Sequence, residues 1–445
     1  MQHISIIGET SNSGSVAYHG LPRCLRGILL GLLGLIYAGC VQFFLGISSA
    51  LLYGTYAVIG ASLAGCLFFE WSSSRRFLST TPYLIFTLAY FIWGAVAVGN
   101  SDVTEEAWKT YLKNILVIGA LCAALDKQSL RSFSQIIQFA AIGNFLICVW
   151  ESFEPELVAE IAYTREEGAT AFNVLRPAGL WSNPDEAAFA FIFALLIGRW
   201  AGTVPRLLGF VSSLVGIYLG ASRTGAYLLT LCGIARLCMW ARHGRVNPLH
   251  LVLFSMIVPI VLLIGTTFID KMSLDEYWQL QRMLDLTESS RGNDEASRVD
   301  IATEAFWTAA AAGWHGTGLF TFQGSSALPC VLDIPAHNIY LVVWGEAGPV
   351  IGLIYLLLLT LGLHRATASS LDPYDRLHLV LMWFSYLIIG FTWHNQFTSF
   401  SGMFYIGLLW HLPKVLNSHD APPHAIQPIP SPGRDATDKQ NFARR

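Results

Sequence analysis

The sequence predicts an all-α integral membrane protein of about twelve transmembrane helices, and three observations indicate this fold class. Only 13% of the 445 residues are charged whereas 53% are hydrophobic, and a soluble domain with so few charges would leave its surface largely apolar. Apolar runs of about 20 residues, the length that crosses a hydrocarbon core of about 30 Å, recur along almost the whole chain. Basic and acidic residues alternate between successive connections, which is typical of membrane topology.

Twelve apolar segments are predicted to form the membrane-spanning helices. They fall at 27–46, 49–69, 82–99, 110–125, 132–150, 185–198, 207–221, 225–240, 249–269, 337–363, 377–393 and 399–413. The first segment is longer than the core of a typical signal peptide and leads directly into the second, so we expect it to remain as a helix. The polar stretch 1–22 and the charged, Pro-rich stretch 414–445 are predicted to be disordered cytoplasmic tails.

The distribution of Lys and Arg predicts the orientation of the helices, because positive residues stay on the cytoplasmic face. Basic residues occupy one set of alternate connections, namely Arg23, Arg26, Arg75, Arg76, Lys127, Arg131, Arg199, Arg206, Arg236, Arg242, Arg245, Arg365, Arg376 and Lys414. The other set is acidic and begins with Asp102, Glu105 and Glu106. We therefore expect an even number of helices and both termini in the cytoplasm.

Two outer connections exceed ordinary length, at 151–184 and 270–336. The chain is thus expected to comprise helices 1–9 over 23–269, a large outer-loop subdomain over 270–336, and helices 10–12 over 337–413. Within the long loop, Glu295–Ala312 has helical spacing of apolar residues, and Asp275–Leu286 suits an amphipathic helix at the membrane surface. Loops of this length are usually functional or disordered, and this one is not disordered in composition.

The composition also excludes some classes of function. The net charge is near −3 and shows no basic character that would indicate a nucleic-acid partner. The eight cysteines form no CxxC pair and lie mostly inside apolar runs, where a small buried hydrophobe is the usual role. We expect no metal centre, and only Cys330 falls clearly in an outer loop.

Arginines on the outer side are the first candidates for a binding site, because charge near hydrocarbon is costly unless it is paired or functional. Arg223 lies against the positive-inside trend between two apolar runs. Its guanidinium fork suits a phosphate, but it could equally reach lipid headgroups. Arg298 stands at the start of the expected loop helix, where amides add anion affinity, yet its acidic neighbours favour a surface ion pair. Arg176 also has acidic neighbours and is structural unless the fold brings it to Arg223.

His337 lies where the long loop meets the next helix, in the run His337-Asn338-Ile339-Tyr340. A neutral imidazole there can act as a general base near physiological pH, and the alternative is a helix-capping or interfacial histidine. His394 is another outer histidine, without basic neighbours. Glu346 falls about two and a half turns into the helix that follows His337, so it should face protein or water. It either pairs with an arginine or holds the helix in place.

Three stretches occur together in a fixed order. Arg176-Pro177-Ala178-Gly179-Leu180-Trp181-Ser182-Asn183-Pro184-Asp185 precedes one helix, Gly220-Ala221-Ser222-Arg223-Thr224-Gly225 connects two, and the long loop carries Ser297-Arg298, Gly316-Thr317-Gly318-Leu319-Phe320 and Ala336-His337-Asn338. This combination resembles the bacterial O-antigen ligase and polysaccharide polymerase superfamily over about residues 170–360. No single motif is specific, so their order and the topology carry the resemblance.

The resemblance implies an inverting, metal-independent glycosyl transfer without a cofactor, on the periplasmic face of the bacterial inner membrane. The donor would be O-antigen glycan on undecaprenyl diphosphate, and the acceptor the lipid A–core oligosaccharide. The residues implied are Arg223 and Arg298 at the donor diphosphate, His337 at the acceptor hydroxyl, and Arg176, Asn338, Glu346 and His394 as possible supporting residues. Arginines can stabilise the charge that develops on a diphosphate leaving group.

Three functions are compatible with the sequence. An O-antigen ligase is preferred because one large outer loop is followed by a histidine at the next helix start. The loop at 151–184 weakens this distinction from an O-antigen or exopolysaccharide polymerase of the same superfamily. A polysaccharide flippase or transporter is the lesser alternative, because such proteins often show repeat symmetry and charges in mid-membrane helices, and neither is apparent here.

Overall fold

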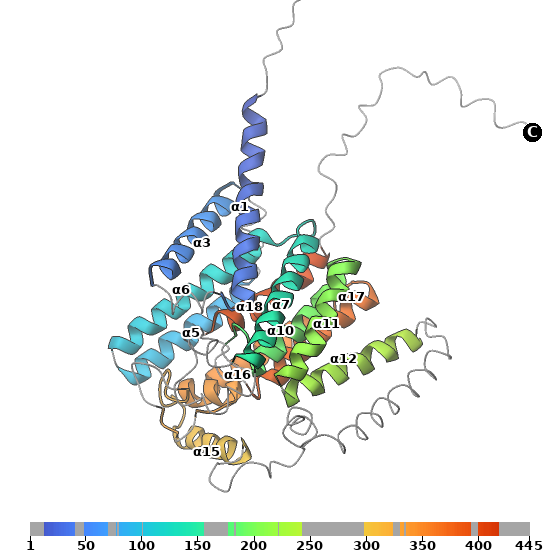
Figure 1. Ribbon diagram of the computed structural model, residues 1–445. Helices are drawn as coiled ribbons and strands as arrows, with labels where there is room; N and C mark the ends of the chain where they lie inside the picture. Colours follow the sequence, from blue (N-terminus) through green and yellow to red (C-terminus); the bar gives the residue numbers. More distant parts are fainter. Residues whose placement is uncertain are drawn as a thin grey trace, which may run out of the picture.

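The computed structural model describes residues 13–40, 49–69, 77, 80–99, 101–154, 177–181, 184–220, 222–242, 298–323, 330–332, 335–392 and 399–417. Every regular element in these ranges is helical, which confirms the expected all-α fold class for this part of the chain. Figure 1 shows a helical bundle, with the start of α1 and the end of α18 on the same side.

The helices are α1 (Ser13–Tyr37), α3 (Ser49–Phe69), α5 (Thr81–Val98), α6 (Ser101–Ala124), α7 (Leu130–Phe153), α10 (Pro184–Ile197), the short 3-10 helix η2 (Gly198–Trp200), α11 (Thr203–Leu219), α12 (Arg223–Arg242), α15 (Arg298–Ala311), α16 (Ile339–Thr367), α17 (Pro373–Ile389) and α18 (Phe400–Asn417). Each expected apolar segment within the described ranges carries a helix. The helix expected over Glu295–Ala312 is confirmed as α15. Segment 249–269 and the amphipathic stretch Asp275–Leu286 lie outside the described residues.

Helices extend into both of the stretches that were expected to be disordered tails. α1 begins at Ser13, inside the stretch 1–22 that was expected to be disordered. α18 continues to Asn417, inside the expected tail 414–445. Both corrections have the same reason: each residue added to an existing helix gains a hydrogen bond without a new nucleation cost.

The first acidic connection is also helical rather than a loop. α6 begins at Ser101, so Asp102 and Glu105 lie on its first turns. Acidic side chains are favourable at the positive end of a helix dipole. Lys109 then forms an ion pair with Glu105 one turn earlier, with 2.6 Å between Nζ and Oε1, a spacing that supports a helix. The charge pattern that suggested a loop therefore suits a helix start.

Among the described helices, four are long and apolar enough to cross a membrane, judged by length and composition, namely α5, α7, α12 and α16. Large apolar side chains also face outward, among them Val96 of α5, which is 73% exposed, and Val350 and Leu353 of α16, which are 59% and 58% exposed. Soluble monomers rarely expose such contiguous apolar surface. The described part of the chain therefore has the helices and the surface of a helical membrane protein.

α10 occupies the centre of the bundle because it is apolar on every side. All of its residues except Asp185 are buried, and a helix that is hydrophobic all round is stable only in the interior. The rings of Phe189 and Phe193 pack against Tyr405 of α18, with centroids 4.6 and 4.8 Å apart. This core fixes the helices whose first turns carry the candidate residues.

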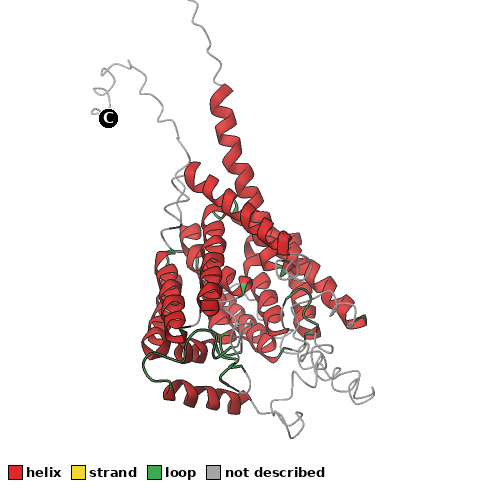
Figure 2. Cartoon of the chain, turned by 90° about the vertical axis from the view of Figure 1, so that its left-hand side faces the viewer, coloured by secondary structure: helices red, strands yellow, loops and turns green. Residues whose placement is uncertain are grey.

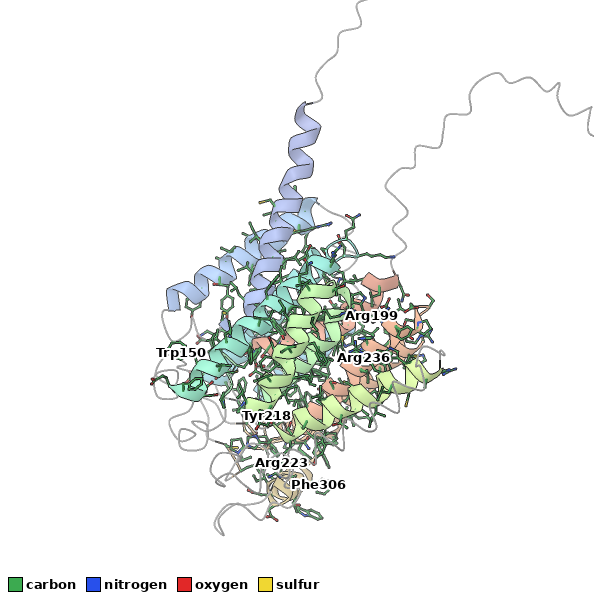
Figure 3. All side chains as sticks on the ribbon, turned by 45° about the vertical axis from the view of Figure 1, so that its right-hand side comes forward. Trp150, Arg199, Tyr218, Arg223, Arg236 and Phe306 are labelled. Atoms are coloured by element: carbon green, nitrogen blue, oxygen red, sulfur yellow. The ribbon has the colours of Figure 1, made fainter. Side chains whose placement is uncertain are left out.

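Labelled arginines lie both at the end of the bundle near α15 and away from it. Figure 3 shows Arg223 and Phe306 of α15 at one end, which we call the α15 end, and Arg199 and Arg236 away from it. The Arg199 guanidinium forms ion pairs with Asp375 and, at 3.1 Å, with Asp372. These basic residues come from connections that were expected to lie on the same side of a membrane.

α16 is interrupted at Gly348 and Pro349, within a segment expected to be one continuous helix. Pro349 has no N–H to donate to the carbonyl of Gly345. Gly348 has φ 82° and ψ 169°, a backbone region essentially restricted to glycine. The carbonyls of Gly345 and Glu346 instead accept the backbone N–H groups of Thr317 at 2.8 Å and of Gly318 at 3.0 Å. The connection after α15 is therefore docked into the interruption of α16.

Replacing Gly348 with alanine should lower the free energy of unfolding by more than about 2 kcal/mol, because a side chain is strained at this φ and overpacks its surroundings. The new Cβ would lie 2.0 Å from the carbonyl oxygen of Trp314. Gly352→Ala is the matched control, since its Cβ would meet the Cβ of Trp344 at 3.4 Å. Thermal unfolding in detergent measures both variants, and equal midpoints would contradict the docked geometry.

Candidate functional site

His337 is held at the α15 end, directly before α16. The side chain of Asn338 caps α16, with Oδ1 accepting the backbone N–H groups of Tyr340 at 3.0 Å and Leu341 at 3.2 Å. The backbone N–H of Ile339 donates to the carbonyl of Gly390, after α17, at 2.9 Å. Asn338, expected as a supporting residue, thus fixes the backbone that carries the exposed His337 side chain.

His337 borders a small hollow between α15, the start of α16 and the segment after α17. Its other lining residues include Ile301 and Ala302 of α15, Leu341 of α16 and Phe391 after α17. The volume of the hollow is about 30 Å³, which accommodates a water molecule or a hydroxyl group but not a sugar ring. The structure therefore brings the candidate base beside α15.

Arg298 is the first residue of that helix, α15. Its backbone precedes Ile301 and Ala302 by three and four residues, so these positions share a helix face. The start of a helix also presents unpaired backbone N–H groups, which favour anions. The structure thus places the backbone of Arg298 next to the His337 hollow, while the Arg298 side chain lies outside what the structure describes.

Glu346 is fully buried in α16 and holds the connection that follows α15. Its carboxylate accepts hydrogen bonds from the Tyr90 hydroxyl of α5 and, at 3.1 Å, from the backbone N–H of Phe322. The side-chain amide of Gln323 donates to it at 3.4 Å. Of the two roles considered for Glu346, these contacts fit the one in which the acid fixes local structure rather than pairing with an arginine.

The docked connection also contacts α5. The backbone N–H of Leu319 donates to the carbonyl of Gly94 at 3.0 Å. A Cβ on Gly316 would lie 2.5 Å from the carbonyl oxygen of Glu346, so only glycine permits the close approach to α16. Together with Tyr90, these contacts join α5, α16 and the outer loop into one unit at the α15 end.

Arg223 begins α12 and is half-buried. The adjacent Ser222 caps this helix, because its Oγ accepts the backbone N–H of Gly225 at 3.1 Å. The same hydroxyl donates to the carboxylate of Asp185, in the first turn of α10, at 2.8 Å. Asp185 is distant in sequence, but it therefore contacts the residue that precedes Arg223. The sequence did not indicate this contact.

A second acid of α10, Glu186, connects the first turn of α18 to this region. The buried carboxylate of Glu186 accepts a hydrogen bond from the hydroxyl of Ser401, in the first turn of α18. The first turns of α10, α12 and α18 consequently meet near Arg223. Acidic side chains in the first turn of α10 are favourable at the positive end of its dipole, and Arg223 places a cation beside them at the start of α12.

Glu151 holds a backbone segment of the candidate site, and the sequence did not identify it. It lies near the end of α7, fully buried, and its Oε2 accepts the backbone N–H groups of Ala178 and Gly179 at 2.9 Å each. Asn144, two turns earlier in α7, accepts the N–H of Leu180 at 2.8 Å. The sequence signal for this role was the spacing of Asn144 and Glu151, which lie two turns apart on one face of the apolar helix α7.

The segment that Glu151 holds approaches the α11–α12 turn. A Cβ on Gly220 would lie 3.3 Å from the carbonyl oxygen of Pro177, and Gly220 is three residues before Arg223. Trp181 anchors the other end of the segment, since its Nε1 donates to the carbonyl of Tyr37 at 2.8 Å. The described part of this motif, 177–181, is therefore packed against the turn that precedes Arg223.

Some expected site residues are not placed. Arg176 and His394 lie outside the described residues. In the described ranges, no group of three His, Cys, Asp or Glu side chains is arranged to hold a metal ion. Burial raises the pKa of the Cys330 thiol, so this outer-loop cysteine is a poor thiolate nucleophile.

Comparisons with protein-family models and with curated proteins found no match to this sequence.

Removing the Glu346 carboxylate should destabilise the protein, because each buried donor left without an acceptor costs about 1–3 kcal/mol. We expect Glu346→Ala to lower the unfolding midpoint more than Tyr90→Phe, which deletes one donor. The double variant should cost less than the sum of the two single variants, since both remove the same hydrogen bond. Additive effects would show that the two side chains act independently.

Glu304→Gln provides the matched control for Glu346. Glu304 is an exposed carboxylate on α15 at the same end of the bundle. Surface substitutions of this kind usually change stability by less than about 0.5 kcal/mol. A midpoint shift in Glu304→Gln as large as in Glu346→Ala would mean that carboxylates at this end stabilise the fold through general charge effects.

Proposed function

We propose that the protein is an O-antigen ligase, which transfers polymerised glycan from undecaprenyl diphosphate to the lipid A–core oligosaccharide in lipopolysaccharide biosynthesis. The single observation that carries this proposal is the position of His337. Its imidazole stands exposed at a hollow of hydroxyl size, beside the helix whose first residue is Arg298. A base next to an anion-binding helix start is the pairing that this transfer needs.

The proposed topology has twelve membrane-spanning helices, both termini in the cytoplasm and the α15 end in the periplasm of a bacterial inner membrane. It is supported by the location of Arg199 and Arg236 away from Arg223 and Phe306 (Figure 3), because positive residues favour the cytoplasmic face. The start of α1 and the end of α18 also lie on the same side of the bundle (Figure 1). The large periplasmic loop over 270–336 would then connect helices 9 and 10.

The chemistry is a single in-line displacement that needs no metal. The acceptor hydroxyl oxygen attacks the anomeric carbon of the donor glycan and forms the new glycosidic bond, while the bond from that carbon to the phosphate oxygen breaks. The electron pair remains on the undecaprenyl diphosphate, and the hydroxyl proton moves to His337. Attack opposite the leaving group inverts the anomeric configuration.

The arginines supply the charge stabilisation in this scheme. A guanidinium binds two phosphate oxygens in parallel, and the leaving diphosphate gains negative charge as the bond breaks. Arg223 begins α12 at the α15 end, and Arg298 begins α15 about one turn before Ile301 and Ala302, which line the hollow. Glu346 and Glu151 would act by holding the two outer segments, and neither would touch the substrate.

Deleting the gene in its source bacterium tests the proposed reaction. A ligase mutant should accumulate long O-antigen on the lipid carrier and make lipopolysaccharide without polymer, which gel electrophoresis of lipopolysaccharide resolves. Lipopolysaccharide capped with a single repeat unit would identify a polymerase of the same superfamily instead. Loss of transfer in cells, combined with no transfer by the purified protein from lipid-linked donor to acceptor, would favour a flippase.

His337→Ala should reduce glycan transfer by the purified protein by about 10²- to 10⁴-fold, the usual contribution of a general base, while the unfolding midpoint stays close to that of the parent protein. His315→Ala is the matched control, because His315 is another exposed histidine of the same outer loop that does not line the hollow. Parent-like turnover in His337→Ala, or equal losses in both variants, would reject His337 as the base.

A further inference from the structure

A cavity of about 500 Å³ opens between the ends of α16 and α18, and we call it the α16–α18 pocket. Three basic side chains line it, those of His364 and Arg365 in the last turn of α16 and of Lys414 in the last turn of α18. Ser369 and Asn417 add polar groups to its walls. Among the described residues that line the pocket there is no acid, so the charges on its walls are all positive. Its volume falls in the range of small-molecule sites.

The acids that follow Arg365 in the sequence have another partner. Asp372 and Asp375 are the first two, and both form ion pairs with Arg199. Within the ranges that the structure describes, neither Arg365 nor Lys414 forms an ion pair. The charge of Arg365 also lies close enough to act on the Lys414 ammonium. Like charges that share a site repel each other, and an anion in the α16–α18 pocket relieves this repulsion.

Aromatic rings, rather than an acid, hold Arg365 in place. Its guanidinium carbon Cζ lies 4.9 Å from the ring centroid of Trp410 in α18, a cation–π contact. Trp410 in turn packs against Trp383 of α17, with centroids 6.3 Å apart. The half-buried Arg365 donates no hydrogen bond to any other residue that the structure describes. A guanidinium carries its N–H donors in a rigid fork that matches phosphate oxygens, so Arg365 is positioned for such a ligand.

The surface of α16 that leads to the α16–α18 pocket is apolar and faces outward. Ile354 and Leu361 lie on the same side of α16 as Arg365, about three turns and one turn before it, and are 42% and 46% exposed. Leu357 lies about two turns before His364 on its side of the helix and is 59% exposed. α16 is also a candidate membrane span. A lipid whose chains lie along these side chains has its headgroup at the pocket.

The α16–α18 pocket lies away from the candidate site around His337. Figures 1 and 2 show α15 across one end of the bundle, and Figure 1 shows the end of α18 on the other side. In the proposed topology this other side faces the cytoplasm, because positive residues favour that face. The cytoplasmic leaflet carries acidic lipids and a negative surface potential, so an anionic headgroup is available at this depth.

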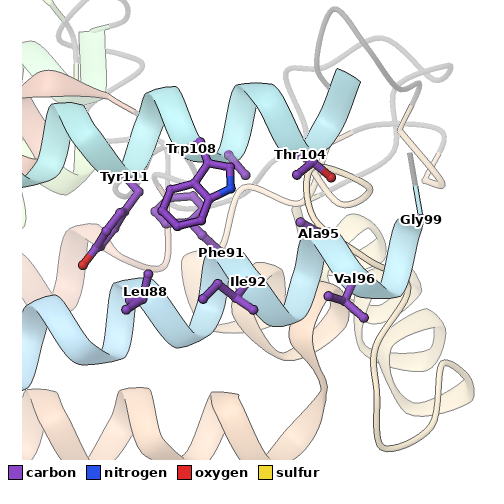
Figure 4. Close-up of a pocket in the computed structure, with 10 residues that line it drawn as sticks. Leu88, Phe91, Ile92, Ala95, Val96, Gly99, Thr104, Trp108 and Tyr111 are labelled. Atoms are coloured by element: carbon purple, nitrogen blue, oxygen red, sulfur yellow. The ribbon is translucent and has the colours of Figure 1, made fainter. Parts of the chain in front are cut away.

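Another open cavity has a similar size but a different lining. It measures about 520 Å³ and lies between α5 and α6, where Leu88, Phe91 and Ile92 face Trp108 and Tyr111 (Figure 4). None of its lining residues is charged, so it provides no group that distinguishes one headgroup from another. Charge, rather than size, is therefore what sets the α16–α18 pocket apart.

We propose that the α16–α18 pocket binds the phosphate group of an acidic phospholipid. Arg365 and Lys414 bind the phosphate oxygens through charge-assisted hydrogen bonds, and the acyl chains lie along the outward apolar side chains of α16. Basic pockets between membrane helices on the cytoplasmic side are suited to acidic headgroups. This inference does not depend on the proposed glycosyl transfer, since none of the residues involved belongs to the candidate site.

Two other roles for these basic residues make different predictions. A cation in the last turn of a helix is favourable because of the helix dipole, but that role concerns stability alone and does not distinguish acidic from zwitterionic lipid. A soluble anion such as inorganic phosphate would use the same cations without the apolar surface of α16. The experiment therefore compares an acidic lipid, a zwitterionic lipid and inorganic phosphate.

Native mass spectrometry of the full-length protein in detergent, titrated with phosphatidylglycerol or phosphatidylcholine, tests the proposal. We expect the parent protein to bind the first phosphatidylglycerol more tightly than phosphatidylcholine. The double variant R365Q/K414Q should bind phosphatidylglycerol about 25-fold more weakly, because each cation near a membrane surface contributes about fivefold. Its affinity for phosphatidylcholine should not change. If the double variant does not fold, Lys414→Gln at an exposed position should weaken phosphatidylglycerol binding about fivefold.

Arg131→Gln is the matched control, because Arg131 is an exposed arginine of α7 from the same set of basic connections and does not line the α16–α18 pocket. Parent-like phosphatidylglycerol binding in R365Q/K414Q, or an equal loss in Arg131→Gln, would overturn the proposal. Thermal unfolding provides the third arm, since a ligand of the folded state raises the midpoint. A rise with inorganic phosphate as large as the rise with phosphatidylglycerol would also overturn it and identify a site for soluble anions.

Discussion

A helix interrupted inside an apolar environment leaves backbone carbonyls that lipid cannot pair, and this constraint organises the α15 end. Each unpaired polar group in hydrocarbon costs several kcal/mol, so the interruption at Gly348 and Pro349 persists only with substitute donors. Thr317 and Gly318 provide them from the connection after α15. The connection after α15 and the interrupted helix α16 therefore depend on each other for their conformation.

Buried carboxylates extend the same principle to both outer segments. Glu346 accepts the N–H of Phe322, and Glu151 accepts those of Ala178 and Gly179. A buried acid is costly without hydrogen bonds, and backbone donors of an irregular segment equally need acceptors. Each acid thus gains the hydrogen bonds that its burial requires and also provides the acceptor that the backbone N–H groups require. One of the two held segments leads back to α15 and the His337 hollow, and the other packs near Arg223.

Much of the helical framework could be predicted because apolar runs report directly on burial in lipid or in the protein core. The start of α6 could not, since its acidic first turns look like a polar loop until helix polarity is considered. The interruption of α16 was visible only as Gly348 and Pro349, and its conformation depends on a partner segment about thirty residues earlier. Tertiary partners of this kind leave no periodic signal.

The residue types of the candidate site could be predicted from the sequence, but the residues that hold them in place could not. His337 was identified from its place at a helix start, and the structure adds the hollow and the cap by Asn338. The anchoring role of Glu151 was missed, because an acid at the end of an apolar run reads as the first residue of a polar connection. Its function becomes apparent only when Ala178 and Gly179 are seen beside it.

Hydrogen exchange at the backbone of Thr317 and Gly318 tests the central claim most directly, because these two amides are the donors that complete α16. In the full-length protein in nanodiscs, both should exchange as slowly as the amides of α16 itself, far more slowly than solvent-exposed loop amides. Exchange at the rate of an open loop would contradict the account, since α16 would then be interrupted without the partner that its carbonyls require.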